Sequence, residues 1–315
     1  MSPEIGKVER TSPENIDFSV VIPAIGSEAK LARLQEVIEA ANRLDRVQEI
    51  ILVWQGEALS PFLRDLPPKV RVVLCETRAT SYARNRGAEF SNSEYLVFLD
   101  DDTIPLGNYS EVASRYLRQG NDFVYANVLT FGVKRSRASQ SITTSIAITR
   151  QTAIGNAWEP GLTISRHNFL KVRYNESLGP GCIHGSSEGL DFAIRLLDSK
   201  LSGIRAHDLV LDHPEIPFDL NYPNKVAFYS FGNGYVAVKN RLLGHYSYDL
   251  SKALARIMIN ILVWNRYEIR VWAIRFLALL IGPILKSQPP LTLSSKPVRE
   301  LSTTSRSPEL VRDEH

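Results

Sequence analysis

The sequence predicts an α/β fold in which a mostly parallel sheet is flanked by helices, with amphipathic helices towards the C-terminus. Two observations carry this prediction. Short apolar runs alternate with stretches of helical periodicity over the first hundred residues, which is the order expected of a parallel sheet with helices on its faces. Residues 251–285 are strongly apolar but are interrupted by arginines, which favours helices with one apolar face.

The first hundred residues alternate between predicted strands and helices. Apolar runs of strand length occur at residues 18–23, 49–54, 70–74 and 94–99, which predicts four buried strands. Apolar residues at helical spacing predict helices over residues 30–44 and 81–90. This βαβαβ order implies that the strands run parallel.

The second half of the chain is more mixed. Residues 122–131 and 204–211 predict two further strands, and residues 188–200 predict a helix. A turn followed by a short strand is expected at residues 159–166, and the polar stretch at residues 134–145 is expected to be mobile.

Composition indicates an ordinary globular protein. The 315-residue chain is 44% apolar and 23% charged with a net charge of +3, and so small a charge argues against a nucleic-acid partner. The two cysteines, Cys75 and Cys182, lie far apart without nearby ligand residues, which predicts a reducing compartment and no disulfide framework. Residues 1–16 are polar and lack the apolar core of a signal peptide. We expect them to form a flexible tail on a cytoplasmic protein.

The segment at residues 246–285 is predicted to form amphipathic helices. Its longest uncharged run covers residues 276–285, whereas a membrane-spanning helix needs roughly 20 apolar residues. Trp264 and Trp272, with the interspersed arginines, suit the headgroup level of a membrane surface. A helical pair packed on the globular domain is an equally favoured alternative. Residues 286–315 are rich in serine, proline and charge, and are expected to be disordered.

Three consecutive aspartates, Asp100, Asp101 and Asp102, follow the strand at residues 94–99. Carboxylates at the end of a parallel strand lie at the edge of the sheet where open α/β folds bind ligands. Three neighbouring acids stay ionised together only beside a cation or several hydrogen-bond donors. Oxygen ligands of this kind suit Mg²⁺ or Mn²⁺, which in turn hold substrate phosphates. The alternative is a solvated turn, since aspartate favours turns.

Motifs along residues 18–240 together resemble a known family. Ser-Val-Val-Ile-Pro at residues 19–23, Ala-Arg-Asn-Arg-Gly at 83–87 and Tyr-Leu-Val-Phe-Leu-Asp-Asp-Asp at 95–102 are similar, in order and spacing, to the inverting family 2 glycosyltransferases of bacterial type. Residues 185–197 resemble the acceptor-side motif of that family, and residues 228–235, followed by Lys239, resemble a Gly-x-Gly segment of some bacterial members.

The resemblance implies a GT-A fold, with a Rossmann-type, mostly parallel sheet. Residues 17–245 would form the transferase domain, of which residues 17–105 bind a nucleotide-sugar donor and residues 106–245 bind the acceptor. The implied function is transfer of a sugar to a glycan or lipid-linked acceptor in cell-surface polysaccharide synthesis. Peripheral contact with the inner face of the plasma membrane is expected from the helices at residues 246–285.

The resemblance also implies a divalent cation, Mg²⁺ or Mn²⁺, as cofactor. Its implied ligands are Asp100, Asp102 and His213, and it would act as the Lewis acid for departure of the donor diphosphate. Asp100 is expected to lean towards the donor ribose, and Asp101 to point outward because side chains alternate along an extended chain. Asp212 is a weaker candidate ligand.

The implied donor-binding residues are Pro23, Gln55, Arg78, Arg84, Asp100 and Asp101. Arg84 would meet the donor phosphate or brace the aspartates, and a structural salt bridge is the alternative. Gln55 stands where the family commonly has an acid, and its amide could accept a hydrogen bond from the nucleotide base. The donor base is therefore left open between UDP, dTDP and GDP.

Inversion at a sugar carbon needs a general base for the acceptor hydroxyl. The family usually supplies it as the Asp of a Glu-Asp pair, but this chain has Glu188-Gly189. Glu188 is the first substitute, and Asp191, one helical turn further on, is the second. Because a helix N-terminus lowers the pKa of a carboxylate, Glu188 must be partly buried to be an effective base.

Two other functions are weighed against transfer. A non-catalytic nucleotide-sugar-binding protein of the same fold is motivated by Gly189 and by Trp54, which lies where the nucleotide base is expected. A sugar-nucleotide pyrophosphorylase would need a glycine-rich, basic loop after the first strand, and Ala-Ile-Gly-Ser at residues 24–27 does not provide one.

Overall fold

The structure is a computed structural model that describes residues 16–56, 60–129, 142–214, 222–290 and 299–301. The predicted tail at residues 1–16, apart from the buried Ile16, lies outside these ranges, as does most of the polar stretch at 134–145.

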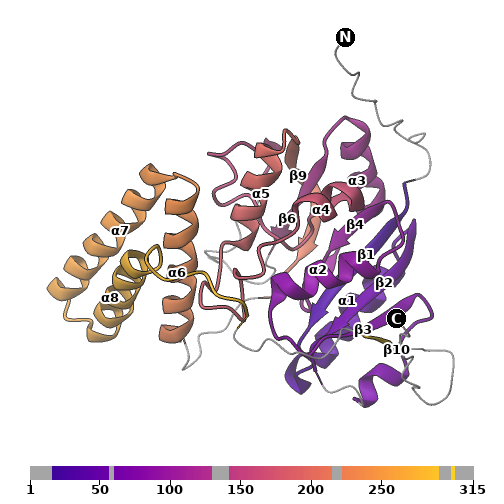
Figure 1. The fold of residues 1–315 in the computed structure, drawn as a ribbon, viewed down its shortest axis with the longest axis horizontal. Helices are drawn as coiled ribbons and strands as arrows, with labels where there is room; N and C mark the ends of the chain where they lie inside the picture. Colours follow the sequence, from indigo (N-terminus) through magenta and orange to yellow (C-terminus); the bar gives the residue numbers. More distant parts are fainter. Residues whose placement is uncertain (1–15, 57–59, 130–141, 215–221, 291–298, 302–315) are drawn as a thin grey trace, which may run out of the picture.

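A single sheet forms the centre of the molecule (Figure 1). Four parallel strands make its first half in the order β3 (Val70–Leu74), β2 (Val47–Trp54), β1 (Phe18–Ala24) and β4 (Tyr95–Phe98). Their apolar, β-branched sequences suit a sheet that is buried on both faces. The predicted α/β class with a mostly parallel sheet is therefore confirmed.

The second half of the sheet is mixed in direction. β8 (Thr163–Ser165) runs antiparallel between β4 and β6 (Phe123–Leu129), and β6 pairs in parallel with β9 (Gly203–Asp212). Two short strands, β5 (Ile104–Pro105) and β7 (Ile146–Ala147), pair antiparallel with β9. This half confirms the strands predicted at residues 122–131, 159–166 and 204–211.

Two layers of helices cover the sheet. On one face α1 (Glu28–Asn42) and α3 (Tyr109–Arg118) share a core with Val20 and Ile22 of β1. The opposite face, which includes Val21, is covered by α2 (Thr80–Phe90), α4 (Arg166–Val172) and α5 (Glu188–Asp198). Alternating residues of β1 thus point into two separate cores, as the pleat of a strand requires.

Three further helices lie beside the sheet domain (Figure 1). α6 (Tyr222–Lys239) and α7 (Leu243–Leu262) both pack on α8 (Arg266–Ile281). The Gly-x-Gly segment at residues 228–235 is part of α6, so it is helical and belongs to this bundle. None of the helices in the described part of the chain is long and apolar enough to cross a membrane.

The expectation for the C-terminal tail is wrong for three of its residues. Residues 286–315 were expected to be disordered, but Arg299–Leu301 forms β10, which pairs antiparallel with β3 at the edge of the sheet. The side chain of Glu300 is anchored there, since its Oε1 lies 2.7 Å from Nε of Arg71. The open edge of β3 and the Nε side of Arg71, which also pairs with Glu49, bind this polar segment in a way that its composition does not reveal.

Candidate active site

The predicted donor side of the site lies at the carboxyl ends of the parallel strands. Ala24 of β1 pairs with Trp54 of β2, and Val21 pairs with Phe98 of β4. Residues that follow these strands therefore meet at one edge of the sheet, the usual place for a ligand in an open α/β fold.

The three aspartates form a turn at this edge. Thr103 closes it, since its backbone N–H donates to the carbonyl of Asp100 at 3.3 Å and its hydroxyl accepts from the Asp100 N–H at 2.9 Å. The expectation that Asp101 points outward is wrong. Its side chain is buried and accepts a 2.7 Å hydrogen bond from Lys30 of α1, because the chain turns after Asp100 and no longer alternates as a strand does. Burial raises the pKa of Asp101, against the effect of Lys30.

Arg84 links the aspartate turn to the acceptor side. Its side chain is 2% exposed; Nη2 lies 2.5 Å from Oδ1 of Asp100, and Nη1 lies 3.6 Å from Oε1 of Glu188. Burial acts to lower the pKa of Arg84, but Asp100 and the other surrounding acids raise it, so the guanidinium stays charged. Of the roles predicted for Arg84, the geometry favours bracing of the aspartates.

Glu188 opens α5 and is 6% exposed. Burial, followed by repulsion from Glu159, raises the pKa of Glu188 to about 8, although Arg84 acts in the opposite direction. Gly179, at φ +94°, lies against the carboxyl group, where an added Cβ would stand 2.8 Å from Cδ of Glu188. The burial that an effective base requires is therefore present and outweighs the helix N-terminus.

Asp191, the second candidate base, is held in an ion-pair network. Its Oδ2 lies 2.8 Å from Nε of Arg195, and its Oδ1 lies 2.7 Å from Nζ of Lys239 on α6. Burial acts to raise the pKa of Asp191, but Arg195 and Lys239 lower it. With both oxygens engaged and the side chain fully buried, Asp191 ties α5 to α6 and has no carboxylate oxygen left for a substrate.

Glu159, which the sequence did not single out, lies beside Glu188. Its carboxylate accepts a hydrogen bond from the backbone N–H of Gly189. Burial raises the pKa of Glu159, and Arg84 opposes this shift. The segment before β8 thus contributes a carboxylate to the first turn of α5, and no local pattern around residue 159 marks that contact.

The structure brings together two of the three predicted cation ligands. Nε2 of His213, at the end of β9, lies 3.8 Å from Oδ1 of Asp102. Nδ1 of His213 lies 2.6 Å from the carbonyl oxygen of Pro214; because a carbonyl only accepts, Nδ1 donates and the Nε2 lone pair is free in the neutral ring. Asp100 turns its Oδ1 to Arg84 instead. Within the described ranges, no group of three or more potential ligands gathers, and Asp212 is paired with Arg33 at 2.7 Å.

The remaining predicted donor residues lie around the same edge. Gln55 follows β2 and is 4% exposed, and its Oε1 is buried without a hydrogen-bond partner in the described structure. Pro23 is buried in β1 opposite Val53. Arg78 is exposed in the loop before α2, where its carbonyl packs against Gly181. Trp54 is a core residue, 1% exposed and stacked on Phe62, so its ring is not open to a ligand.

The loop before α5 is held in place by hydrogen bonds to α6 and to the residue that follows α8. The N–H of Gly185 donates to the carbonyl of Phe228 at 3.0 Å, and the Ser186 hydroxyl donates to the carbonyl of Tyr229 at 2.7 Å. Gly232 of α6 allows this approach, since a Cβ there would lie 2.4 Å from the carbonyl oxygen of Ser186. His184, which is fully buried, lies 3.1 Å through Nε2 from the carbonyl oxygen of Gly282, just after α8.

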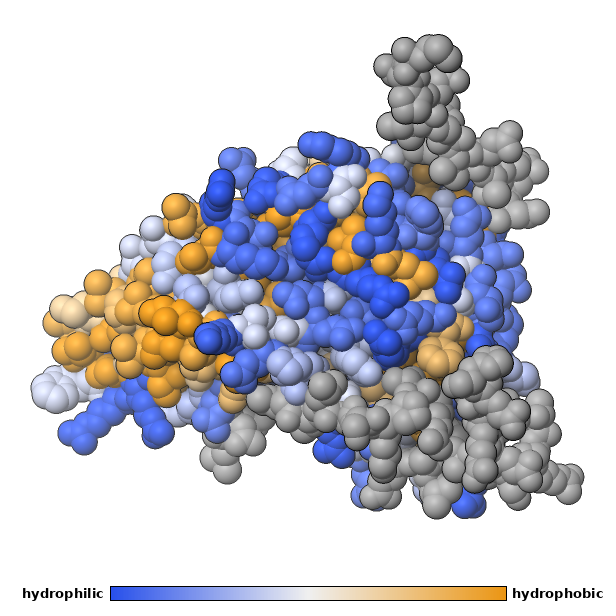
Figure 2. Space-filling model, in the orientation of Figure 1, coloured by the Kyte–Doolittle hydropathy of each residue, from blue (hydrophilic) through white to orange (hydrophobic). Residues whose placement is uncertain are grey.

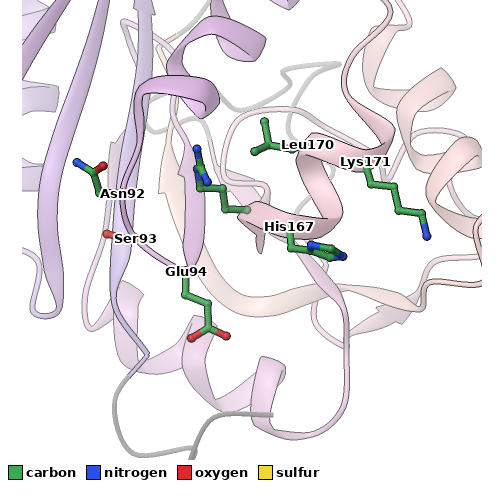
Figure 3. A pocket seen from close by; sticks show the side chains of 7 residues that line it. Asn92, Ser93, Glu94, His167, Leu170 and Lys171 are labelled. Carbon is green, nitrogen blue, oxygen red and sulfur yellow. The ribbon is translucent and has the colours of Figure 1, made fainter. Parts of the chain in front are cut away.

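A surface hollow of about 550 Å³ lies at the other end of β4 (Figure 3). Asn92, Ser93 and Glu94 line it just before β4, and His167 and Lys171 line it from α4. Because the hollow precedes β4 and the aspartates follow it, the two lie at opposite edges of the sheet. The hollow therefore contains none of the predicted site residues.

Comparisons with solved structures identify similar folds. Residues 1–349 of TarS from S. aureus match with a TM-score of 0.52 and 14% identity, over 71% of this chain and 65% of that chain. The same TarS fragment in complex with UDP-GlcNAc gives a TM-score of 0.53 at 14% identity, over 71% and 66%. This chain thus spans just under two thirds of the TarS fragment. At this identity the similarity shows a shared fold.

The sequence itself matches the glycosyl transferase family 2 model over residues 19–178. No curated protein matches it. The matched half of the chain contains the first strand, Arg84 and the aspartate turn, and ends before Glu188. From this match and the GT-A-like sheet, the chain belongs to glycosyl transferase family 2, as its motifs predicted.

Proposed function

We propose that this protein is an inverting glycosyltransferase in which Glu188 accepts the proton of the acceptor hydroxyl. The observation that carries the proposal is Arg84, which contacts both Asp100 on the donor side and Glu188 on the acceptor side. A buried carboxyl group with a pKa of about 8 suits a general base near neutral pH.

The proposed step is a direct displacement. The acceptor oxygen attacks the anomeric carbon, its O–H bond breaks with the proton passing to Glu188, and the bond from that carbon to the diphosphate oxygen breaks with its electron pair leaving on the nucleotide. Arg84 keeps Glu188 and the aspartate turn in fixed positions relative to each other during this displacement. Nη1 and Nε of Arg84 make no hydrogen bonds in the described structure. The guanidinium therefore has N–H donors left to stabilise the negative charge that develops during the displacement.

The residues fit a divalent cation. Asp102 and His213 would hold it, since Mg²⁺ and Mn²⁺ sites in nucleotide enzymes commonly use one or two protein ligands and complete their shell with substrate phosphates. The tautomer set by Pro214 leaves Nε2 of His213 available as a ligand. When bound, the cation would neutralise the departing diphosphate. Lys30, whose Nζ lies 3.8 Å from Asp102 Oδ2, keeps the carboxylate oriented.

Gln55 supports binding of the nucleotide base. Its Oε1 is buried and unpartnered in the described structure, so an N–H of the base would satisfy an acceptor that otherwise costs free energy. Uracil, guanine and thymine all present a ring N–H. UDP-GlcNAc, which is the ligand of the TarS complex, is the first donor to test.

The acceptor side supports a lipid-linked acceptor at a membrane surface. Four consecutive exposed apolar residues form the tip between α7 and α8: Ile261 (46% exposed), Leu262 (80%), Val263 (65%) and Trp264 (80%). Figure 2 shows apolar side chains over this end of the molecule. The exposed charged residues of α7 and α8 near the tip are basic, namely Lys252, Arg256, Arg266 and Arg270. An apolar tip ringed by basic groups fits the interface of an anionic bilayer.

Donor turnover tests the proposal. The wild-type protein, Asp102→Ala and Glu188→Gln are incubated with Mn²⁺ and a panel of nucleotide sugars that includes UDP-GlcNAc. We expect turnover by the wild type and a loss of at least about a hundredfold in each variant. If both variants turn over donor as the wild type does, the assigned site is wrong. If the wild type binds nucleotide diphosphate but never turns donor over, the protein is a non-catalytic binder.

A further inference from the structure

Position 189 is the point at which this chain departs from the acceptor motif, and the structure gives a reason. A Cβ at Gly189 would stand 2.2 Å from Oε1 and 2.6 Å from Cδ of Glu159, and 2.8 Å from the carbonyl oxygen of Ala157. Real side chains do not approach so closely, so no residue other than glycine fits while Glu159 stays in place. The space that a side chain at position 189 would enter is filled mainly by the carboxylate of Glu159, with the carbonyl of Ala157 beside it.

Glu159 is held there by the backbone of α5. The Gly189 N–H, one of the unpaired donors of the first helical turn, donates to Glu159 Oε1. The carboxylate therefore caps α5 from a segment 30 residues earlier in the chain, and its position is fixed to that of Glu188, the neighbouring residue.

The charges around Arg84 connect Glu159 to the base. Asp100, Glu159 and Glu188 all interact electrostatically with this one guanidinium. The single positive charge of Arg84 does not balance three carboxylates in this buried place. The repulsion between Glu159 and Glu188 therefore favours a state in which these two carboxylates share one proton.

We propose that Glu159 supplies from a distant segment the second acidic group that the acceptor motif lacks at Gly189, and that it acts as a positioning residue for Glu188. This inference rests on the proposed function and deepens it. Glu159 fixes the first turn of α5 and places a negative charge beside the base, so that Glu188 takes up a proton more readily. Glu159 then takes the place of the acid that is missing at position 189. The Glu188-Gly189 pair therefore does not indicate a lost active site.

A charge-removing variant tests the positioning role. Glu159→Gln keeps the size of the side chain and an oxygen that accepts from Gly189, so a merely structural role would be preserved. The other groups that face Glu188 are unchanged: Arg84 from α2, Asp100 after β4, Tyr174 and Cys182 from the acceptor loop (residues 173–187, between α4 and α5), and Tyr229 from α6.

We expect the ascending limb of kcat against pH to move down by about one unit in Glu159→Gln, with a plateau lowered at least about threefold and donor KM nearly unchanged. Glu94→Gln, in the hollow at the opposite edge of the sheet, is the control and should match the wild type. An unshifted limb in Glu159→Gln overturns the proposal.

A stability cycle tests the placement without any donor, so it remains informative if the proposed function fails. Thermal unfolding is compared for the wild type, Gly189→Ala, Glu159→Ala and the double variant. The added methyl at position 189 should lower Tm by several degrees beside Glu159 and by clearly less in the Glu159→Ala protein, because the two closest contacts are gone and only the Ala157 carbonyl remains. Equal decreases in the two backgrounds overturn the proposal.

Discussion

The guanidinium of Arg84 joins Asp100, at the end of β4, to Glu188, at the start of α5, through contacts of 2.5 Å and 3.6 Å. These residues lie 88 positions apart in the chain and belong to the donor and acceptor halves of the predicted domain. A planar group with several donors can contact both at once, whereas a lysine ammonium is a single point charge. The geometry of the site therefore depends on an arginine at this position.

Arg84→Lys is expected to lower kcat at least about a hundredfold, because an ammonium cannot hold both carboxylates and a buried acid is left unpaired. Donor turnover and thermal unfolding measure the effect. Arg86→Lys is the matched control, since Arg86 lies on the same helix and pairs with Glu89 and Glu176 in a more exposed place. An Arg84→Lys protein with wild-type turnover would contradict the bracing role.

Glu188→Gln is expected to unfold at a higher temperature than the wild type at pH 8, by on the order of 3 °C. The raised pKa means that the folded protein disfavours the ionised carboxylate, so the wild type loses stability as the pH rises from about 4.5 to about 8. The glutamine cannot ionise, so the difference in Tm should vanish towards pH 4.5. Thermal unfolding across this range measures it, and a constant difference would contradict the assigned pKa.

Asp102→Asn and His213→Ala are expected to raise the Mn²⁺ concentration needed for half-maximal turnover by about 10- to 100-fold, since each removes a proposed ligand. Turnover titrated with Mn²⁺ measures this requirement. His167→Ala, a change to an exposed histidine of α4, is the control and should leave the titration unchanged. Turnover in the absence of divalent cations would show that the cation is not required.

Gly232→Ala is expected to lower the free energy of unfolding by about 1–3 kcal/mol, because the added methyl meets the Ser186 backbone. The same change should reduce turnover, since Ser186 lies two residues before Glu188. Gly244→Ala is the matched control on α7, where nothing lies within 4 Å of an added Cβ, and it should stabilise the helix by about 0.5 kcal/mol. Denaturant unfolding compares the two, and equal effects would contradict the docking of α6 on the acceptor loop.

Leu262→Ser combined with Trp264→Ser is expected to weaken binding to anionic phospholipid vesicles at least about tenfold, because two large apolar side chains leave the interface. Vesicle co-sedimentation measures the binding. Leu243→Ser is the control, since Leu243 is also exposed but begins α7 at the end away from the tip. Vesicle binding that is equal in all three proteins would contradict a membrane-facing tip.

The sequence predicts most of the sheet because its strands are buried on both faces and carry long apolar runs. β1, β2 and β3 are found within two residues of their predicted bounds, and the aspartate turn follows directly from the apolar run before it. The same local signals could not show that Asp101 is buried by Lys30, because that contact depends on how α1 packs against the sheet.

The acceptor half is harder to predict because its contacts join distant segments. Glu159 accepts a hydrogen bond from the N–H of Gly189, which lies 30 positions later in the chain. Asp191 forms an ion pair with Lys239 on α6. Neither pairing leaves a periodic pattern in the sequence. The one local signal is Gly189 itself, since a glycine in the first turn of a helix, where the motif has an acid, indicates that something else occupies the space.

Glu188→Gln gives the most direct test of the proposed base, because donor binding and chemistry can be measured separately on the same protein. Binding of UDP-GlcNAc with Mn²⁺ is measured by thermal shift, and turnover is measured on the same protein at pH 8. If Glu188 is the base, binding stays within about threefold of the wild type, whereas turnover falls at least about a hundredfold. Turnover equal to that of the wild type, with binding preserved, would contradict the assignment of Glu188 as the base.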